Sequence, residues 1–158
     1  MNDTDRVVYI DMDGVMFDFD AAAVAGIPED QRVIRSSFYI TQDYPEAVRA
    51  GIRAVCDAPG FFENLSLIPG VIEAWRTLLA HGYHPRVLSA PLGSNPTSVK
   101  GKIESLRRHL VPEFGQSVID EAIFDREKWR YPGLAIIDDR PDIVLGDDSG
   151  GVATWEHI

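Results

Sequence analysis

The chain has 158 residues, of which 45% are hydrophobic and 25% charged, so it can form one compact domain with a small insertion. Its formal net charge of −10 argues against a nucleic-acid polymer as a partner, because binding a long phosphate backbone requires a basic face. No apolar run approaches the roughly 18 to 20 residues of a membrane helix. The N-terminus carries acids where a signal peptide carries basic residues. We therefore expect a soluble cytoplasmic protein without a membrane partner.

Short apolar segments alternate with amphipathic helices along the chain. Residues 6–11 predict a buried strand that a turn at Asp-Met-Asp-Gly ends, and further strands are expected at 86–89, 121–124, 134–137 and 151–155. Helices are expected over 69–82 and from Thr97 or Ser98 to Leu110, with a short helical turn starting at Pro141. This alternation is typical of an α/β fold, a Rossmann-like parallel sheet with helices on both faces.

Residues 20–62 do not follow this alternation. They contain weak helical patterns, the clearer one over 44–57 with Ala47, Val48, Ile52 and Val55 on one side. No linker marks this segment as an independent domain. We expect a helical cap insertion at 20–62 and a core domain formed by 1–19 and 63–158. Cys56, the single cysteine, excludes an internal disulfide and is expected to pack inside the insertion.

Polar side chains follow three of the predicted strands. Asp11 and Asp13 follow the first strand, Ser89 ends the second, and Asp138 and Asp139 follow the fourth. Ligands of open parallel sheets bind beyond the carboxyl ends of the strands, so these groups are expected to meet at one edge. Carboxylates that face one another repel unless a cation bridges them, and Mg²⁺ accepts a few carboxylates together with water and phosphate oxygens.

Basic residues between the second and fourth strands add positive charge to this edge: Lys100, Lys102, Arg126 and Lys128. Lysines beside a metal site are expected where the substrate itself is negatively charged, so the combination favours a site for a phosphoryl group. An exposed aspartate can attack phosphorus there, and a second acid two residues on can protonate the leaving oxygen. Each motif has a plainer interpretation, because Asp-Gly can form a hairpin turn and Asp138-Asp139 can cap a helix.

This constellation resembles the haloacid dehalogenase superfamily of phosphohydrolases. The Asp-x-Asp-Gly-Val motif stands at 11–15, the hydroxyl motif at Ser89 and the paired acids at Asp138 and Asp139. The segments DMDGVMFDFD, FFENLSLIPGVIEAW, IIDDRPDI and TWEH are similar to the 5′(3′)-deoxyribonucleotidase family, and the similarity runs from about Val7 to His157. The insertion is its weakest part.

The resemblance implies roles for individual residues. Asp11 would be the nucleophile and a Mg²⁺ ligand, while Asp13 would be the general acid and base and offer its backbone carbonyl to the metal. Ser89 would donate to the phosphate. Asp138 and Asp139 would hold the metal, one of them through water, and the sequence leaves open which.

The resemblance also implies substrate contacts. Lys102 stands at the place of a phosphate-binding lysine, with Lys100 as a nearby alternative, and Arg126 and Lys128 match a basic pair. Whether Lys102 or Lys128 is the main phosphate lysine stays open. Aromatic residues fall where the family builds its base pocket: Phe38, Tyr39, Phe61 and Phe62. Ala90 replaces a hydroxyl that the family usually has beside the phosphate, so substrate preference stays open.

The combined prediction is a Mg²⁺-dependent phosphomonoesterase that acts on small substrates, 5′-(deoxy)ribonucleoside monophosphates first, through an aspartyl-phosphate intermediate. The nearest alternative is a phosphatase of the same superfamily acting on a non-nucleotide such as a sugar phosphate. An alternative of another class is a catalytically silent metal- or phosphate-binding module. A homodimer stays open, because small members of such folds often dimerise.

Overall fold

A five-stranded parallel sheet forms the centre of the protein. The computed structural model describes residues 3–141, 143 and 154–158. The strands are β1 (Val7–Ile10), β2 (His84–Ser89), β3 (Ile123–Phe124), β4 (Ala135–Ile137) and β5 (Glu156–His157), in the spatial order β3-β2-β1-β4-β5. Every pairing is parallel. This arrangement confirms the α/β fold class that the sequence predicts.

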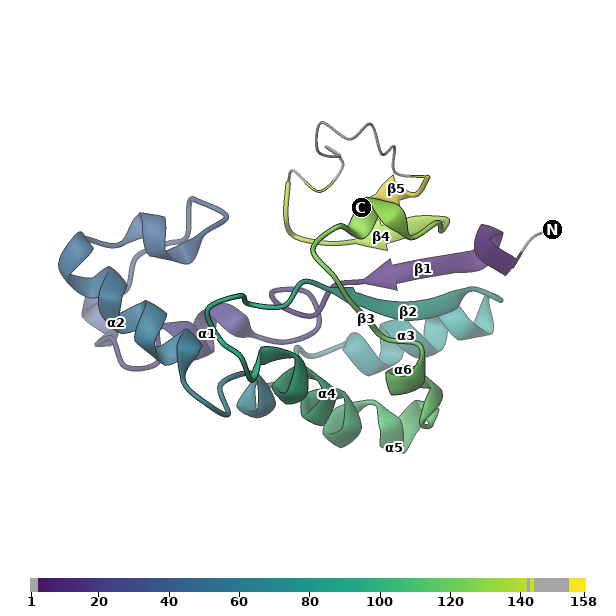
Figure 1. Ribbon diagram of the computed structural model, residues 1–158, viewed down its shortest axis with the longest axis horizontal. Coiled ribbons are helices and arrows are strands. Elements are labelled where there is room, and N and C mark those ends of the chain that lie inside the picture. Colours follow the sequence, from purple (N-terminus) through teal and green to yellow (C-terminus); the bar gives the residue numbers. More distant parts are fainter. Residues whose placement is uncertain (1–2, 142, 144–153) are drawn as a thin grey trace.

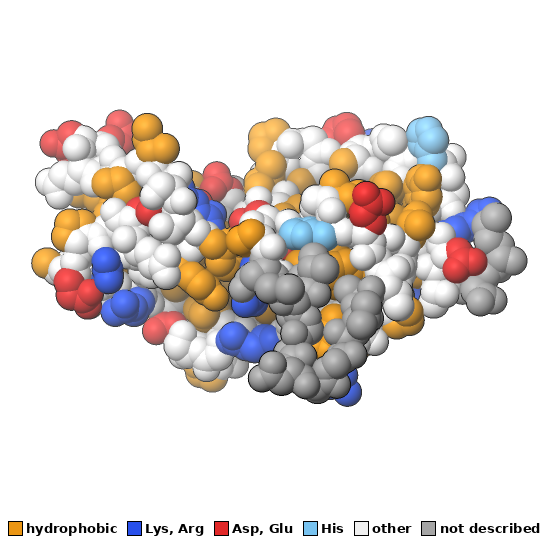
Figure 2. Space-filling model, turned by 90° about the horizontal axis from the view of Figure 1, so that it is seen from above, with side chains coloured by type: hydrophobic (Ala, Val, Ile, Leu, Met, Phe, Trp, Pro, Cys, Tyr) orange, Lys and Arg blue, Asp and Glu red, His pale blue; other side chains and the backbone are white. Residues whose placement is uncertain are grey.

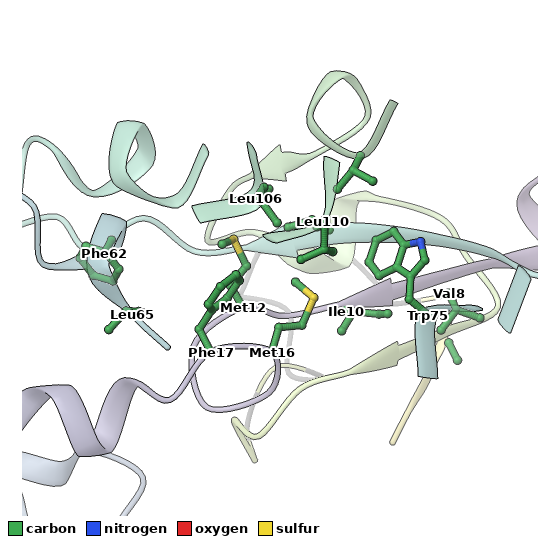
Figure 3. Close-up of a cluster of buried hydrophobic side chains, with 13 residues drawn as sticks. Val8, Ile10, Met12, Met16, Phe17, Phe62, Leu65, Trp75, Leu106 and Leu110 are labelled. Carbon is green, nitrogen blue, oxygen red and sulfur yellow. The ribbon is translucent and has the colours of Figure 1, made fainter. Parts of the chain in front are cut away.

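Helices cover one face of the sheet (Figure 1). They are α3 (Val71–Ala80), α4 (Ser98–His109), α5 (Val111–Phe114) and α6 (Ser117–Asp120). Because successive strand residues point to opposite faces, Val8 and Ile10 of β1 meet Trp75 of α3 and Leu106 of α4 in the main core (Figure 3). Burial of both faces explains why β1 is apolar throughout.

The opposite face of the sheet has a second apolar cluster. Val7 and Tyr9 of β1 pack there with Ile136, Ile143 and Trp155. The short 3-10 helix η5 (Lys128–Arg130) precedes β4 on the chain, and Tyr131 at its end packs against the same cluster.

The segment between β1 and α3 extends beyond the carboxyl ends of the strands (Figure 1). It contains α1 (Phe19–Ala23) and α2 (Glu46–Asp57), and between them the 3-10 helices η2 (Glu29–Gln31) and η3 (Ile40–Asp43). Ala23, Tyr44, Ile52 and Cys56 form an apolar cluster of their own inside this segment. The 3-10 helix η4 (Phe62–Asn64) then returns the chain to the core, where it packs against α4.

Some predicted details differ in the structure. On α2 the buried side chains are Ile52 and Cys56, whereas Ala47 and Val55, expected on the inner side, are exposed. A strand lies at Glu156–His157, and the strand predicted at 151–155 falls mostly outside the described residues. The helical turn expected from Pro141 also falls largely outside them. Among the helices that the structure describes, none has both the length and the apolar character to span a membrane.

Candidate active site

Three carboxylates meet at the carboxyl edge of the sheet. Asp11 directly follows β1, and Asp138 and Asp139 directly follow β4. The two strands are neighbours, and the Asp11 amide extends their ladder by donating to the Ile137 carbonyl oxygen at 2.9 Å. One carboxylate oxygen from each of the three aspartates lies within 4.8 Å of the others. Oxygen atoms this close are positioned to share one hard cation.

Lys128 occupies the space between two of these carboxylates. Its Nζ lies 2.9 Å from Asp11 Oδ1 and forms an ion pair with Asp138 Oδ2. Burial acts to lower the pKa of this ammonium, but Asp11 and Asp138 outweigh it and the pKa is raised. Lys128 therefore stays cationic and compensates part of the negative charge.

The remaining negative charge shows in the carboxyl groups themselves. Burial, reinforced by the neighbouring Asp11, raises the pKa of Asp138, and the same causes raise the pKa of Asp139 to about 6. Among the described residues, Lys128 pairs with Asp11 and Asp138, and Arg35 pairs with Asp20 and Asp139. A further cation between Asp11, Asp138 and Asp139 would reduce the repulsion among these three carboxylates.

The loop after β1 folds tightly around the Met12 carbonyl oxygen. That oxygen accepts hydrogen bonds from the amides of Met16 at 2.9 Å and Phe17 at 2.8 Å. Gly14 permits the turn with a φ of +75°, a conformation that L side chains rarely adopt. It also lets the loop approach Asp139, because a Cβ at this position would lie 2.4 Å from Asp139 Oδ2.

A second ion pair links this loop to α4. Lys102 Nζ donates to Asp13 Oδ2 at 2.8 Å, to Ser89 Oγ at 2.8 Å and to the Ala90 carbonyl oxygen at 2.7 Å. Burial is the main cause that raises the pKa of Asp13; Lys102 acts against it and Asp11 adds to it. Lys100, the alternative lysine, is exposed on the same helix.

A cavity of about 450 Å³ opens in front of these groups. Asp11, Asp13, Asp138, Asp139 and Lys128 form its floor, and residues of α1, η3 and α2 form the opposite wall. In Figure 2 the molecule is hollowed between the part that carries α2 and the part that carries the sheet, with carboxylates along the hollow. A small molecule in this cavity would touch both parts.

The structure brings most of the predicted site residues to this cavity. Ten of them line it: Asp11, Asp13, Phe38, Tyr39, Phe62, Ala90, Arg126, Lys128, Asp138 and Asp139. Ser89 and Lys102 are fully buried directly behind this lining. Phe61 does not line the cavity and packs edge-on against Phe19 and Phe62, with ring centroids 5.3 and 5.0 Å away.

Arg35 is a site residue that the sequence analysis missed. Its Nη1 lies 2.7 Å from Asp20 Oδ2 and 3.7 Å from Asp139 Oδ2, and its guanidinium faces the Phe38 ring at 5.5 Å. It therefore connects the segment around α2 to the acidic cluster. Arg35 lies in an irregular stretch without periodicity, and no local signal distinguishes it from Arg32, which is exposed.

Residues 5–148 match the model of the family described as 5′ nucleotidase, deoxy (pyrimidine), cytosolic type C protein. The chain belongs to this family. The resemblance to the haloacid dehalogenase superfamily and to its deoxyribonucleotidases is thereby confirmed, and the protein is a phosphoric monoester hydrolase.

Individual relatives agree with this assignment. The chain is 35% identical over 159 residues to a Bordetella bronchiseptica protein named "Putative 5′(3′)-deoxyribonucleotidase", which covers 96% of this chain and 81% of that protein. It is 32% identical over 163 residues to the human 5′(3′)-deoxyribonucleotidase, cytosolic type, covering 96% and 77% of the two chains. The crystal structure of a Streptococcus pneumoniae hydrolase shares the fold with a TM-score of 0.50 at 13% identity, covering 98% of this chain and 92% of that one.

Proposed function

We propose that the protein hydrolyses 5′-(deoxy)ribonucleoside monophosphates through an aspartyl-phosphate intermediate on Asp11 and requires Mg²⁺. The observation that carries this proposal is the meeting of Asp11, Asp138 and Asp139 within 4.8 Å at the floor of a cavity that Asp13 also lines. The names of the relatives support the nucleotide substrate, and the human relative's description as the cytosolic type supports a cytoplasmic location.

The residues at the floor of the cavity suit a magnesium ion. Asp11, Asp138 and Asp139 would hold it, together with the backbone carbonyl of Asp13. The donor set consists of hard oxygens, and burial together with the neighbouring Asp11 raises the pKa values of Asp138 and Asp139, so a bound cation would offset the repulsion between these carboxylates. When bound, Mg²⁺ supplies the positive charge that stabilises the phosphoryl oxygens in the transition state.

The proposed chemistry runs in two steps. In the first, a carboxylate oxygen of Asp11 attacks phosphorus, the bond from phosphorus to the ester oxygen breaks, and Asp13 gives its proton to the departing sugar oxygen. In the second, Asp13 takes a proton from water, the water oxygen attacks phosphorus, and the bond to Asp11 breaks. Inorganic phosphate leaves and Asp11 is restored. The raised pKa of Asp13 suits the first step, because the acid must carry a proton when the ester oxygen leaves.

Other residues would bind the substrate. Lys128 would neutralise the phosphoryl oxygens, and the Ser89 hydroxyl would donate a hydrogen bond to one of them. Arg126, held by the Pro91 carbonyl oxygen at 2.9 Å, would extend the positive rim. Residues 20–62 would act as a cap over the core of 1–19 and 63–158, with Phe38 and Tyr39 against the base. By covering the site, the cap would exclude bulk water.

A panel of phosphate esters tests the proposal. With Mg²⁺, we expect saturable phosphate release from deoxyribonucleoside 5′-monophosphates, little from sugar phosphates, and none in the presence of a chelator. Asp11→Asn should abolish turnover, because an amide is a poor nucleophile and a weak metal ligand. The control Asp120→Asn changes a carboxylate outside the cavity lining and should retain activity. Preference for sugar phosphates would contradict the substrate, and an active Asp11→Asn variant would contradict the mechanism.

A further inference from the structure

Lys102 is a fully buried cation behind the wall of the cavity. Its exposed fraction is 0%, and it is not among the residues that line the cavity. The close approach of α4 to η4 buries it: a Cβ at Gly101 would lie 3.0 Å from both the Glu63 amide nitrogen and Phe62 Cβ. The Phe62 ring itself faces Lys102 Nζ at 5.1 Å. A side chain enclosed in this way cannot swing out to meet a substrate.

The three protons of the Lys102 ammonium are already engaged. An ammonium group carries three donors and no acceptor. Asp13, Ser89 and Ala90 each accept one hydrogen bond from it, all between 2.7 and 2.8 Å. A direct contact between Lys102 and a phosphoryl oxygen would require one of these bonds to break in a buried setting, where an unpaired polar group is costly.

These bonds fix the Asp13 carboxyl group, which would handle the proton. Lys102 binds Asp13 through Oδ2, while Asp13 Oδ1 has no hydrogen-bond partner within the part of the chain that the structure describes. Ser89 Oγ accepts from Lys102, so its own proton stays available for another acceptor. Lys102 thus engages Oδ2 of Asp13 and leaves the buried Oδ1 and the single Ser89 proton without a partner from this ammonium.

We propose that Lys102 is a positioning residue for leaving-group protonation, one that holds the Asp13 carboxyl group in a single arrangement and does not touch the phosphate. This inference rests on the proposed function, in which Asp13 protonates the departing sugar oxygen. It also gives the phosphate-binding task to Lys128, which lines the cavity and contacts Asp11. Loss of Lys102 should therefore matter most where the leaving oxygen needs a proton.

The test compares two leaving groups in single-turnover experiments with enzyme in excess and Mg²⁺ present. A deoxyribonucleoside 5′-monophosphate releases a sugar oxygen that needs a proton, whereas p-nitrophenyl phosphate releases a phenolate that leaves without one. In Lys102→Met we expect nucleoside release to fall about 100-fold, the usual size of a general-acid contribution, and p-nitrophenolate release to change little. The half-saturating concentrations should stay the same. Equal losses on both substrates, or weaker half-saturation at an unchanged maximal rate, would overturn the proposal.

Two controls keep the result interpretable. Arg107→Met removes an exposed cation from the same helix, one that pairs with Glu104, and should leave both rates unchanged. If Lys102→Met loses its circular dichroism signal, Asp13→Asn is compared with the double variant Asp13→Asn/Lys102→Met, which removes both charges of the pair. Equal rates of nucleoside release support the proposal, and a further fall in the double variant overturns it. A wild-type protein that releases neither product refutes the proposed function itself.

Discussion

Replacing Gly14 by alanine tests how closely the loop after β1 approaches the acidic cluster. A side chain at φ +75° costs about 1 kcal/mol. The new Cβ would also lie 2.4 Å from Asp139 Oδ2 and 3.1 Å from Asp139 Cγ, well inside van der Waals contact. Because the carboxylate ends a short side chain with rotatable bonds, Asp139 can relieve this overlap by turning away. The overlap should therefore weaken metal binding more than it weakens the fold.

Gly70 provides the matched control. It is left-handed, with φ +92° and ψ −11°, and a Cβ there would meet nothing within 4 Å, so Gly70→Ala carries the backbone strain without the overlap. In urea unfolding with a chelator, we expect both variants to lose about 1 kcal/mol of unfolding free energy. In a phosphatase assay, Gly14→Ala should need about 10-fold more Mg²⁺ for half-maximal rate, and Gly70→Ala should match the wild type. An unchanged Mg²⁺ requirement in Gly14→Ala would refute the reasoning.

Two further predictions concern charges in the same cluster. Lys128→Met leaves Asp11 and Asp138 without the cation between them. In urea unfolding at pH 7 with a chelator, the unfolding free energy should therefore fall by about 3–5 kcal/mol. A fall near zero would contradict the pairing. Asp139 has a pKa of about 6 in the folded protein, above its ordinary 3.8. Between these two values the folded state still holds the Asp139 proton, whereas the unfolded state has lost it. The Asp139 carboxyl group therefore destabilises the folded state increasingly as pH rises from about 4 to 6. With a chelator present, Asp139→Asn should therefore become increasingly stable relative to the wild type over this pH range, as measured by the difference between their unfolding free energies. A difference that does not depend on pH would show that the pKa of Asp139 is not raised.

The sheet was predictable because its strands are buried on both faces. The run Val7–Ile10 is apolar without interruption, which is the pattern of a central parallel strand, and the structure places it in the middle of the sheet. The shorter strands were harder to locate. The final strand Glu156–His157 has two residues, one of them charged, and carries no apolar run that would mark its position.

The helix faces were predictable only in part. On α2, Cys56 and not Val55 is buried, because the partner surface of Ala23 and Tyr44 lies to one side of the predicted stripe. On α4 the buried face includes Lys102 and Ser105 beside Leu106. By composition such a polar stripe resembles a solvent-exposed face, so burial of Lys102 cannot be inferred from periodicity.

Order along the chain was enough to indicate that Asp11, Ser89 and Asp138 share one edge, because each ends or directly follows a strand and parallel strands end on the same side. It could not indicate what each cation touches. Lys102 is 89 residues from Asp13, and Arg35 reaches Asp139 from the far side of the cavity. Such contacts depend on how α4 and the segment around α2 pack against the sheet, since a hydrogen bond forms only within about 3 Å and along a narrow range of directions. The amino-acid order thus determined which chemical groups are present at the site, and packing alone decided which of them pair and which stay available to a substrate.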